Sequence, residues 1–304
     1  LLKASVWTMT RVNEIDTAKQ LIKVGDSQTA IHFSKLVLAV GAEVISPPIQ
    51  GDALELVYSV NDLLDYDDFR TAIAKNKVKK ICIIGGGLIG CEFTNDLING
   101  GFEVEAVDPL GYCLPTLLPE PAGKAVQAAL EAKGAKFHFG PLVTAVNKAD
   151  SGILVSLNNG ATIAADIVVS AVGVRPRTGL AKASGIATNR GIVTNRLLET
   201  SAPNVYAMGD CAEVDGHVLV YVAPLVAAAR ALGKTLAGEP TEVSYPAMPV
   251  TIKTPACPVV VAPPAAGAEG EWIIAADGSN VKAEFRDSDG KLLGFALTGE
   301  ATKE

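Results

Sequence analysis

The feature that most constrains this chain is a set of three glycines placed directly after an apolar run. Residues 81–84 form that short run, which predicts a strand buried on both faces of a sheet. Gly85, Gly87 and Gly90 follow in the order G-x-G-x-x-G and open a predicted helix. Asp108 ends the next predicted strand, 21 positions after Gly87. This order of strand, glycine turn, helix and acidic strand end predicts a βαβ unit that binds a dinucleotide.

The chemistry of a dinucleotide explains why each glycine is needed. Gly85 permits the tight turn after the strand, and Gly87 lets the backbone approach a pyrophosphate. Gly90 lets the helix pack closely on the strand. The N–H groups at the start of the helix, those of Leu88 and Ile89 included, favour bound negative charge together with the helix dipole.

Asp108 is the predicted ligand of the adenosine ribose, because its carboxylate can accept hydrogen bonds from both ribose hydroxyl groups. A carboxylate at this point repels the 2′-phosphate of NADPH, and residues 109–111 supply no basic side chain in its place. The sequence therefore predicts NADH as the nicotinamide cofactor.

Composition limits the classes of protein to which the chain can belong. Its 304 residues leave room for roughly two domains of about 150 residues each. The 33 Asp and Glu residues outnumber the 26 Lys and Arg residues, and the net charge of −7 argues against nucleic acid or an anionic membrane as a partner. No apolar run approaches the about 20 residues that a membrane-spanning helix needs.

The cysteine and histidine residues are scattered along the chain. The cysteines show no C-x-x-C spacing, which argues against a paired redox disulfide and a zinc knuckle; they are Cys82, Cys91, Cys113, Cys211 and Cys257. The 3 histidines likewise lack ligand spacing, so no metal site is expected. An odd number of isolated cysteines is typical of a reducing cytoplasm, where we expect the protein. Cys82, inside its apolar run, is expected to be a small buried hydrophobic residue.

Other patterns predict the remaining elements in outline. Helices are expected over about 61–75, 91–98, 120–133 and 225–237, the first of them capped by an Asn or Asp residue. The runs 36–41 and 167–173 predict buried strands, and both end in Ala-Val-Gly, an internal repeat that indicates two related α/β domains. Another strand ends in Gly209-Asp210, which places a carboxylate at the ligand-binding edge of a sheet. A hairpin of 281–286 and 291–298 is expected near the end of the chain.

Together these motifs resemble the FAD-dependent pyridine nucleotide-disulfide oxidoreductases of the glutathione reductase type. The strand end at 39–41, the glycine fingerprint at 85–90, the string 171–176 and the Gly209-Asp210 motif occur in the order found in that family. Within the family, the strings 90–93, 207–213 and 249–258 are most similar to the branch that reduces rubredoxin. The resemblance covers the whole chain.

The resemblance implies an α/β fold with two Rossmann-like dinucleotide-binding domains, the NAD domain inserted into the FAD domain, and a small α+β C-terminal domain. We expect the FAD domain at 1–46 and 177–246, the NAD-binding domain at 47–176 and the C-terminal interface domain at 247–304. The first G-x-G-x-x-G of the family, which binds the FAD pyrophosphate, does not occur in residues 1–80. About 80 residues that include the first βαβ unit are therefore expected before Leu1.

The resemblance also assigns cofactor contacts. Asp210 is expected to bind the ribityl chain of FAD, Val222 to lie beside the flavin ring just before a helix, and Val12 to contact the adenine through its backbone. The expected FAD contacts are Val12, Ala39, Gly41, Asp210, Val222 and Lys253. The expected NAD contacts are Gly85, Gly87, Leu88, Ile89, Gly90, Glu92, Asp108, Val172 and Gly173.

Three of these assignments have a structural alternative. Glu92, expected in the first turn of its helix, either stabilises the helix dipole or points toward the nicotinamide or the partner cofactor. Lys253 is either a solvated strand lysine or a cation over the flavin ring that favours reduction. Val172 and Gly173 either end a strand or lie beside the nicotinamide ribose.

By resemblance, the expected activity is transfer of electrons from NADH through FAD to rubredoxin, with the nicotinamide held flat against the flavin. No catalytic acid–base pair is expected, and Glu92 and Lys253 would only modulate the transfer. A reductase of ferredoxin or flavorubredoxin and an NADH oxidase share the same motifs and stay open. A non-enzymatic NADH-binding regulator is the alternative of another class. The sequence does not predict the oligomeric state.

Overall fold

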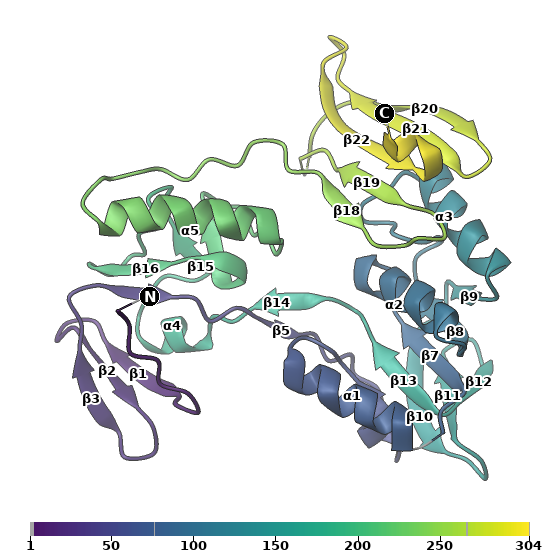
Figure 1. Cartoon of the computed structure of the whole chain (residues 1–304), viewed down its shortest axis with the longest axis horizontal. Helices are drawn as coiled ribbons and strands as arrows, with labels where there is room; N and C mark the ends of the chain where they lie inside the picture. The colour runs from purple at the N-terminus through teal and green to yellow at the C-terminus, as the bar shows by residue number, and fades with distance from the viewer. Residues whose placement is uncertain (1–2, 76, 266, 304) are drawn as a thin grey trace. The chain divides into compact units, whose positions relative to one another are not determined.

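The computed structural model describes residues 3–75, 77–265 and 267–303. The chain forms two compact units, each discontinuous in sequence (Figure 1). The first unit contains residues 1–43 and 174–248, and the second unit contains residues 44–173 and 249–304. Each unit has its own core and is described by itself. No helix in the described ranges is both long and apolar enough to cross a bilayer.

A parallel sheet forms the centre of the second unit. Among the described residues its strand order is β6-β13-β7-β8-β9, and every neighbouring pair is parallel. The order changes direction at β7, because β8 and β9 lie on one side of it and β13 on the other. In doubly wound folds the carboxyl ends of strands at such a switch point form the ligand crevice. The strands are β6 (Val57–Tyr58), β7 (Lys80–Ile84), β8 (Glu103–Asp108), β9 (Lys136–Phe139) and β13 (Ile167–Ser170).

Helix α1 (Leu63–Lys75) begins where the sequence predicts. The Oδ1 atom of Asp62 accepts hydrogen bonds from the N–H groups of Leu64 and Asp65, 2.9 and 3.0 Å away. These are orphan donors at a helix start, so the predicted acidic cap is confirmed.

Two more helices of the second unit match expected segments. Helix α2 (Leu88–Asn99) begins directly after Gly87, three residues earlier than the predicted 91. Helix α3 (Glu120–Ala132) carries a proline in its first turn, where the missing N–H has no cost, and it buries one apolar face.

Antiparallel sheets complete the second unit within the described residues. One consists of β10 (Val143–Lys148), β11 (Ile153–Leu157) and β12 (Thr162–Ala165). The other has the order β18-β19-β22-β21-β20, and its β21–β22 pair confirms the predicted hairpin. The strand β20 was not expected from the sequence. The strands of this C-terminal sheet are β18 (Val250–Ile252), β19 (Val259–Ala262), β20 (Glu271–Asp277), β21 (Asn280–Arg286) and β22 (Leu292–Thr298). Two short 3-10 helices also belong to this unit: η1 (Leu54–Leu56) precedes β6, and η3 (Gly299–Lys303) follows β22.

The C-terminal sheet shares one hydrophobic cluster with α2 and α3. Cys91 of α2, Val126 of α3, and Ile252 and Val259 of the sheet are all at most 1% exposed in this cluster. Burial of this apolar area ties the C-terminal sheet to the helices of the parallel sheet, so these parts of the chain form one packed body.

The first unit contains a three-stranded meander, parallel strand pairs and a long helix, among the residues described. The meander is β1-β2-β3, and β16 pairs in parallel with β4 and β15 with β17. In addition, β5 (Ala42–Val44) pairs with β14 (Val174–Pro176). The other elements of the first unit are β1 (Val12–Asp16), β2 (Leu21–Val24), β3 (Thr29–His32), β4 (Leu36–Leu38), α4 (Gly179–Ala183), β15 (Ile192–Thr194), β16 (Val205–Ala207), η2 (Gly209–Cys211), β17 (Ala212–Val214) and α5 (Val222–Leu236).

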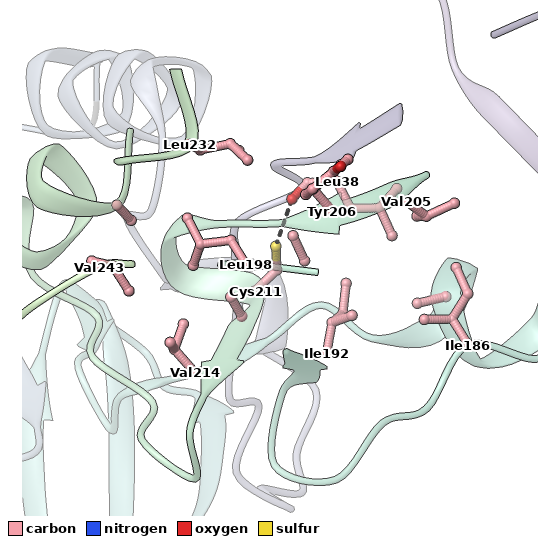
Figure 2. Packing of buried hydrophobic residues seen from close by; sticks show 14 of the residues in the cluster. Leu38, Ile186, Ile192, Leu198, Val205, Tyr206, Cys211, Val214, Leu232 and Val243 are labelled. Carbon is pink, nitrogen blue, oxygen red and sulfur yellow. Dashed lines mark hydrogen bonds between the residues drawn. The ribbon is translucent and has the colours of Figure 1, made fainter. Parts of the chain in front are cut away.

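Figure 2 shows the core of the first unit. Leu38 of β4, Ile192 of β15 and Val205 of β16 pack together with the loop residue Leu198. The predicted strand over 36–41 is shorter than expected and not buried on both faces, since Leu38 is buried while Ala39 is exposed. Among the described residues β4 has β16 as its one hydrogen-bonded neighbour.

Candidate functional site

The glycine fingerprint forms the turn between β7 and α2, and its three glycines differ in what they touch. Gly85 has φ +112°, and a Cβ there would lie 2.5 Å from the carbonyl oxygen of Ala171. A Cβ on Gly90 would overlap the carbonyl oxygen of Gly85. A Cβ on Gly87 would meet nothing within 4 Å. Gly85 and Gly90 are therefore required by the fold itself, whereas Gly87 leaves open space above the helix start.

Asp108, at the end of β8, is 9% exposed and holds the fingerprint turn in place. Its Oδ2 accepts the N–H of Gly86 at 2.6 Å, and its Oδ1 accepts the N–H of Leu110 at 2.8 Å. Each carboxylate oxygen has a second lone pair, so ribose hydroxyls can still donate to it. The role of Asp108 as a ribose ligand stays a prediction, and the structure adds a role in ordering the backbone around the dinucleotide site.

Val172 and Gly173 follow β13 at the switch point of the parallel sheet. The Ala171 N–H donates to the Ile84 carbonyl at 2.8 Å, which fixes this strand end beside the fingerprint turn. Gly173 has φ +103°, and its carbonyl accepts the N–H of Ile45. The structure thus brings Val172 next to Gly85 in the crevice where doubly wound folds bind ligands.

Glu92 was expected in the first turn of its helix, and this expectation was wrong. Because α2 starts at Leu88, Glu92 lies in the second turn, too far along for a strong effect on the dipole. Its Oε1 accepts the backbone N–H of Lys253 at 2.7 Å. Glu92 therefore joins helix α2 to the segment that follows β18, a long-range contact that the sequence did not indicate.

Cysteines near the fingerprint are structural. Cys82 and Cys91 are fully buried, as expected for Cys82. Burial, with the charge of Glu105 nearby, raises the pKa of the Cys82 thiol to about 12. The Sγ of Cys91 donates to the Gly86 carbonyl at 3.3 Å and so helps to hold the turn.

In the first unit, Asp210 lies in the short helix η2 directly after β16. The next residue, Cys211, is fully buried and its Sγ donates to the Leu38 carbonyl at 3.4 Å, the dashed line in Figure 2. This bond and the positive φ of Gly209 at +73° fix the turn that presents Asp210. Burial raises the pKa of the half-buried Asp210 carboxyl, which no cation offsets.

Val222 is the first residue of α5, rather than a residue before the helix, because α5 begins three residues before the predicted 225. Its side chain is 76% exposed, unusual for valine at a helix start. The Leu225 side chain, one turn on, lies next to Gly209, where a Cβ would be 3.3 Å from Leu225 Cδ1. The start of α5 and the Asp210 turn are therefore neighbours, as a common flavin site requires.

A groove of about 1020 Å³ in the first unit carries four arginines that were not predicted as site residues. Val12 and Val40 lie in its wall, beside two of the expected FAD contacts, Ala39 and Gly41. The arginines are Arg11, Arg175, Arg177 and Arg190, and Glu43 is the one acid of the groove lining. Guanidinium groups bind phosphate oxygens in a bidentate manner, so the groove suits an anionic ligand.

Contacts to side chains and backbone carbonyls hold three of these arginines in place. Arg175 Nε lies 2.8 Å from Glu43 Oε1, and Arg177 donates to the Val40 carbonyl. Arg190 donates to the Gly216 carbonyl at 2.7 Å. The sequence signal that could have found two of them is the pair Arg175-x-Arg177, which directly follows the second Ala-Val-Gly strand end.

The buried carboxylate of Glu213 holds the turn that carries Arg190. Its two oxygens accept hydrogen bonds from Asn189 Nδ2 and from the Gly191 N–H, both at 3.0 Å. Burial alone would raise the pKa of Glu213, but these hydrogen bonds and the Arg190 charge outweigh it and lower the pKa. The stabilisation that this ionised group gives is thus present above its unfolded-state pKa and is lost as the pH falls.

Residues 2–233 match the family described as pyridine nucleotide-disulphide oxidoreductase. The chain belongs to the pyridine nucleotide-disulphide oxidoreductase family. Residues 242–304 match the rubredoxin binding C-terminal domain. The family and the fold class expected from the sequence are confirmed.

Two named relatives and one solved structure are similar to most or all of this chain. The rubredoxin-NAD(+) reductase of Alcanivorax borkumensis is 57% identical over 304 residues, which are 100% of this chain and 78% of that protein. The nitric oxide reductase FlRd-NAD(+) reductase of Aliivibrio fischeri is 36% identical over 97% of this chain and 76% of that protein. A ferredoxin reductase from Rhodopseudomonas palustris superposes with a TM-score of 0.87 over 97% of this chain and 74% of that chain, at 24% identity, and shows the shared fold.

Proposed function

We propose that this protein is an NADH-dependent flavoprotein that passes electrons from NADH through FAD to rubredoxin. The observation that carries the proposal is the match of residues 242–304 to a rubredoxin-binding domain. A rubredoxin reductase that is 57% identical over the whole chain supports the same activity. FAD, when bound, supplies the chemistry that links two-electron transfer from a nicotinamide to one-electron transfer to an iron protein.

On the NADH side, the protein's task is to bind and orient the dinucleotide. We assign Gly85, Gly87, Leu88, Ile89 and Gly90 to the pyrophosphate turn. The start of α2 offers N–H donors and a positive dipole end to the phosphates. Asp108 is assigned to the adenosine ribose, and Val172, Gly173 and Glu92 to the neighbourhood of the nicotinamide.

On the flavin side, we assign Asp210 to the ribityl chain and Val12, Ala39 and Gly41 to the adenosine end. The arginine groove supports this assignment, because it supplies fixed positive charge beside Val12. The exposed Val222 at the N-terminus of α5 suits an apolar ring face, and the helix dipole favours negative charge on the reduced flavin. A position of Lys253 over the flavin ring stays a prediction.

The proposed domain plan assigns the FAD domain to 1–46 and 177–246, the NAD domain to 47–176 and the interface domain to 247–304. We also propose that the protein works in the cytoplasm. All five cysteines are unpaired and buried, which suits a reducing compartment. Fractionation of cells into cytosol, membranes and periplasm, followed by assay of NADH-dependent rubredoxin reduction, tests the location.

The test of the function compares electron acceptors with the purified, flavin-loaded protein. NADH should bleach the flavin absorbance, and rubredoxin should then be reduced with a kcat/KM at least tenfold above that of a [2Fe–2S] ferredoxin. Flavorubredoxin is the second candidate acceptor, which the 36% identical FlRd reductase supports, and it belongs in the same comparison. Fast reduction of oxygen alone would point to an NADH oxidase instead. A colourless protein that binds NADH would support the regulator hypothesis.

Asp210→Asn should stabilise the apoprotein slightly while weakening flavin binding. Burial raises the pKa of Asp210, so the ionised carboxylate opposes folding; this cost is absent at low pH, grows as the pH rises above the unfolded-state pKa and is complete above the raised pKa. The amide removes the cost but also removes an acceptor for the ribityl hydroxyls. Thermal melting of the apoprotein at pH 7 and the ratio of flavin to protein absorbance measure both effects. Full flavin retention in the variant would contradict the assignment.

A further inference from the structure

Two side chains of the NAD-binding helix hold one short turn of the C-terminal segment. Glu92 Oε1 accepts the Lys253 N–H at 2.7 Å, and Asn95 Oδ1 accepts the Ala256 N–H at 3.1 Å. Glu92 and Asn95 are three positions apart and so lie on the same face of α2. Asn95 is only 3% exposed. The turn over 253–257 is therefore attached to the helix at two points, where its backbone N–H groups donate to side chains of α2.

The turn is rigid in itself. Thr254 is 1% exposed, its Oγ1 donates to the Cys257 carbonyl at 2.7 Å, and the Cys257 N–H donates back to the Thr254 carbonyl at 2.8 Å. Prolines at 255 and 258 fix two φ angles of the same stretch. Cys257 is buried in the cluster that the C-terminal sheet shares with α2 and α3. Because the turn is rigid, its two anchors on α2, Glu92 and Asn95, determine where the backbone of Lys253 lies.

The anchors are close to the expected phosphates of NADH. Glu92 follows Gly87 by five residues, about 7.5 Å along a helix axis. Lys253 is exposed, and its long flexible side chain starts at the residue bonded to Glu92. The Asp108 carboxylate at the end of β8 accepts the Gly86 N–H of the fingerprint turn, so a cation near this turn would offset the negative charge of the carboxylate when an anion binds.

We propose that Asn95, together with Glu92, positions Lys253 at helix α2, so that the C-terminal segment contributes a cation to the NADH site, in place of the position over the flavin ring that the resemblance implies. The inference rests on the proposed function only in taking the fingerprint turn as the NADH site. Asn95 is a positioning residue, and Lys253 is the residue that reaches the dinucleotide.

The proposal is tested without any electron acceptor by titration calorimetry, which measures NAD⁺ binding to the oxidised holoenzyme at several salt concentrations. Lys253→Met should weaken NAD⁺ binding about fivefold and flatten its salt dependence, because an ammonium–phosphate contact is screened by salt. Asn95→Leu should cause most of the same loss. The double variant should bind no worse than Lys253→Met alone, since both changes act on one contact.

Two further variants separate positioning from general damage. Asn95→Gln keeps the amide oxygen that accepts the Ala256 N–H and the amide group that donates to Asp96, so it should restore part of the binding that Asn95→Leu loses. Lys291→Met removes an equal charge from the exposed turn between β21 and β22 and should change nothing. Amide hydrogen exchange should show faster exchange at Ala256 in Asn95→Leu, a readout that does not depend on either cofactor.

The outcomes are decisive in both directions. Unchanged NAD⁺ affinity in Lys253→Met overturns the proposal, and this exposed site is expected to tolerate the change. Faster exchange at Ala256 with unchanged affinity in Asn95→Leu also overturns it. If these variants change NAD⁺ binding as predicted but the wild-type protein fails to reduce rubredoxin, the proposed acceptor is refuted and the present inference stands.

Discussion

Gly87→Ala should weaken NADH binding about 100-fold while leaving the stability of the folded protein almost unchanged. Gly87 has φ −77° and ψ −165°, a conformation that alanine adopts freely, and a Cβ there meets no atom within 4 Å. That open space is where the pyrophosphate has to approach the backbone, so the added methyl group would collide with the ligand alone. NADH titration by fluorescence and thermal melting of the same samples measure the two quantities.

Gly90→Ala is the matched control, because the same methyl group there overlaps the Gly85 carbonyl inside the folded protein. We expect it to lower the melting temperature by several degrees as well as to impair binding, as overpacking does. If Gly87→Ala bound NADH like the wild type, the fingerprint would not be the pyrophosphate site. A large fall in its melting temperature would show that Gly87 has a structural role instead.

Local sequence signals predicted the dinucleotide turn well. The turn depends on glycine spacing, an apolar strand and an acid at a strand end, and all of these lie within about 30 residues of one another. The cap at Asp62 and the hairpin of β21 and β22 are local in the same sense. The predicted starts of α2 and α5 differ from the observed starts by three residues each. Helix ends are the hardest boundaries to predict, because alternative caps are similar in energy.

Contacts between distant parts of the chain could not be predicted in the same way. Glu92 and Asn95 bond to residues 161 positions away, and no periodicity in the sequence links them to Lys253 and Ala256. The arginine groove likewise combines side chains near residue 11 with others near 175 and 190. The pairing of β14 with β5 brings Arg175 and Arg177 beside Glu43 and Val40, so this part of the groove appeared only with the fold.

Asp108→Arg should lower kcat/KM for NADH by about 100-fold or more and make NADPH the better substrate. The change removes the acceptor of the Gly86 and Leu110 N–H groups and the expected ribose ligand, and each unmet buried hydrogen bond costs about 1–3 kcal/mol. The guanidinium in its place attracts a 2′-phosphate that the carboxylate repels. Steady-state kinetics with both cofactors and a saturating acceptor measure the switch. Asp108→Asn, the matched control, keeps one oxygen acceptor and adds no cation, so it should lose NADH activity without gaining NADPH activity. Unchanged kcat/KM for NADH in Asp108→Arg would show that Asp108 is not the ribose ligand.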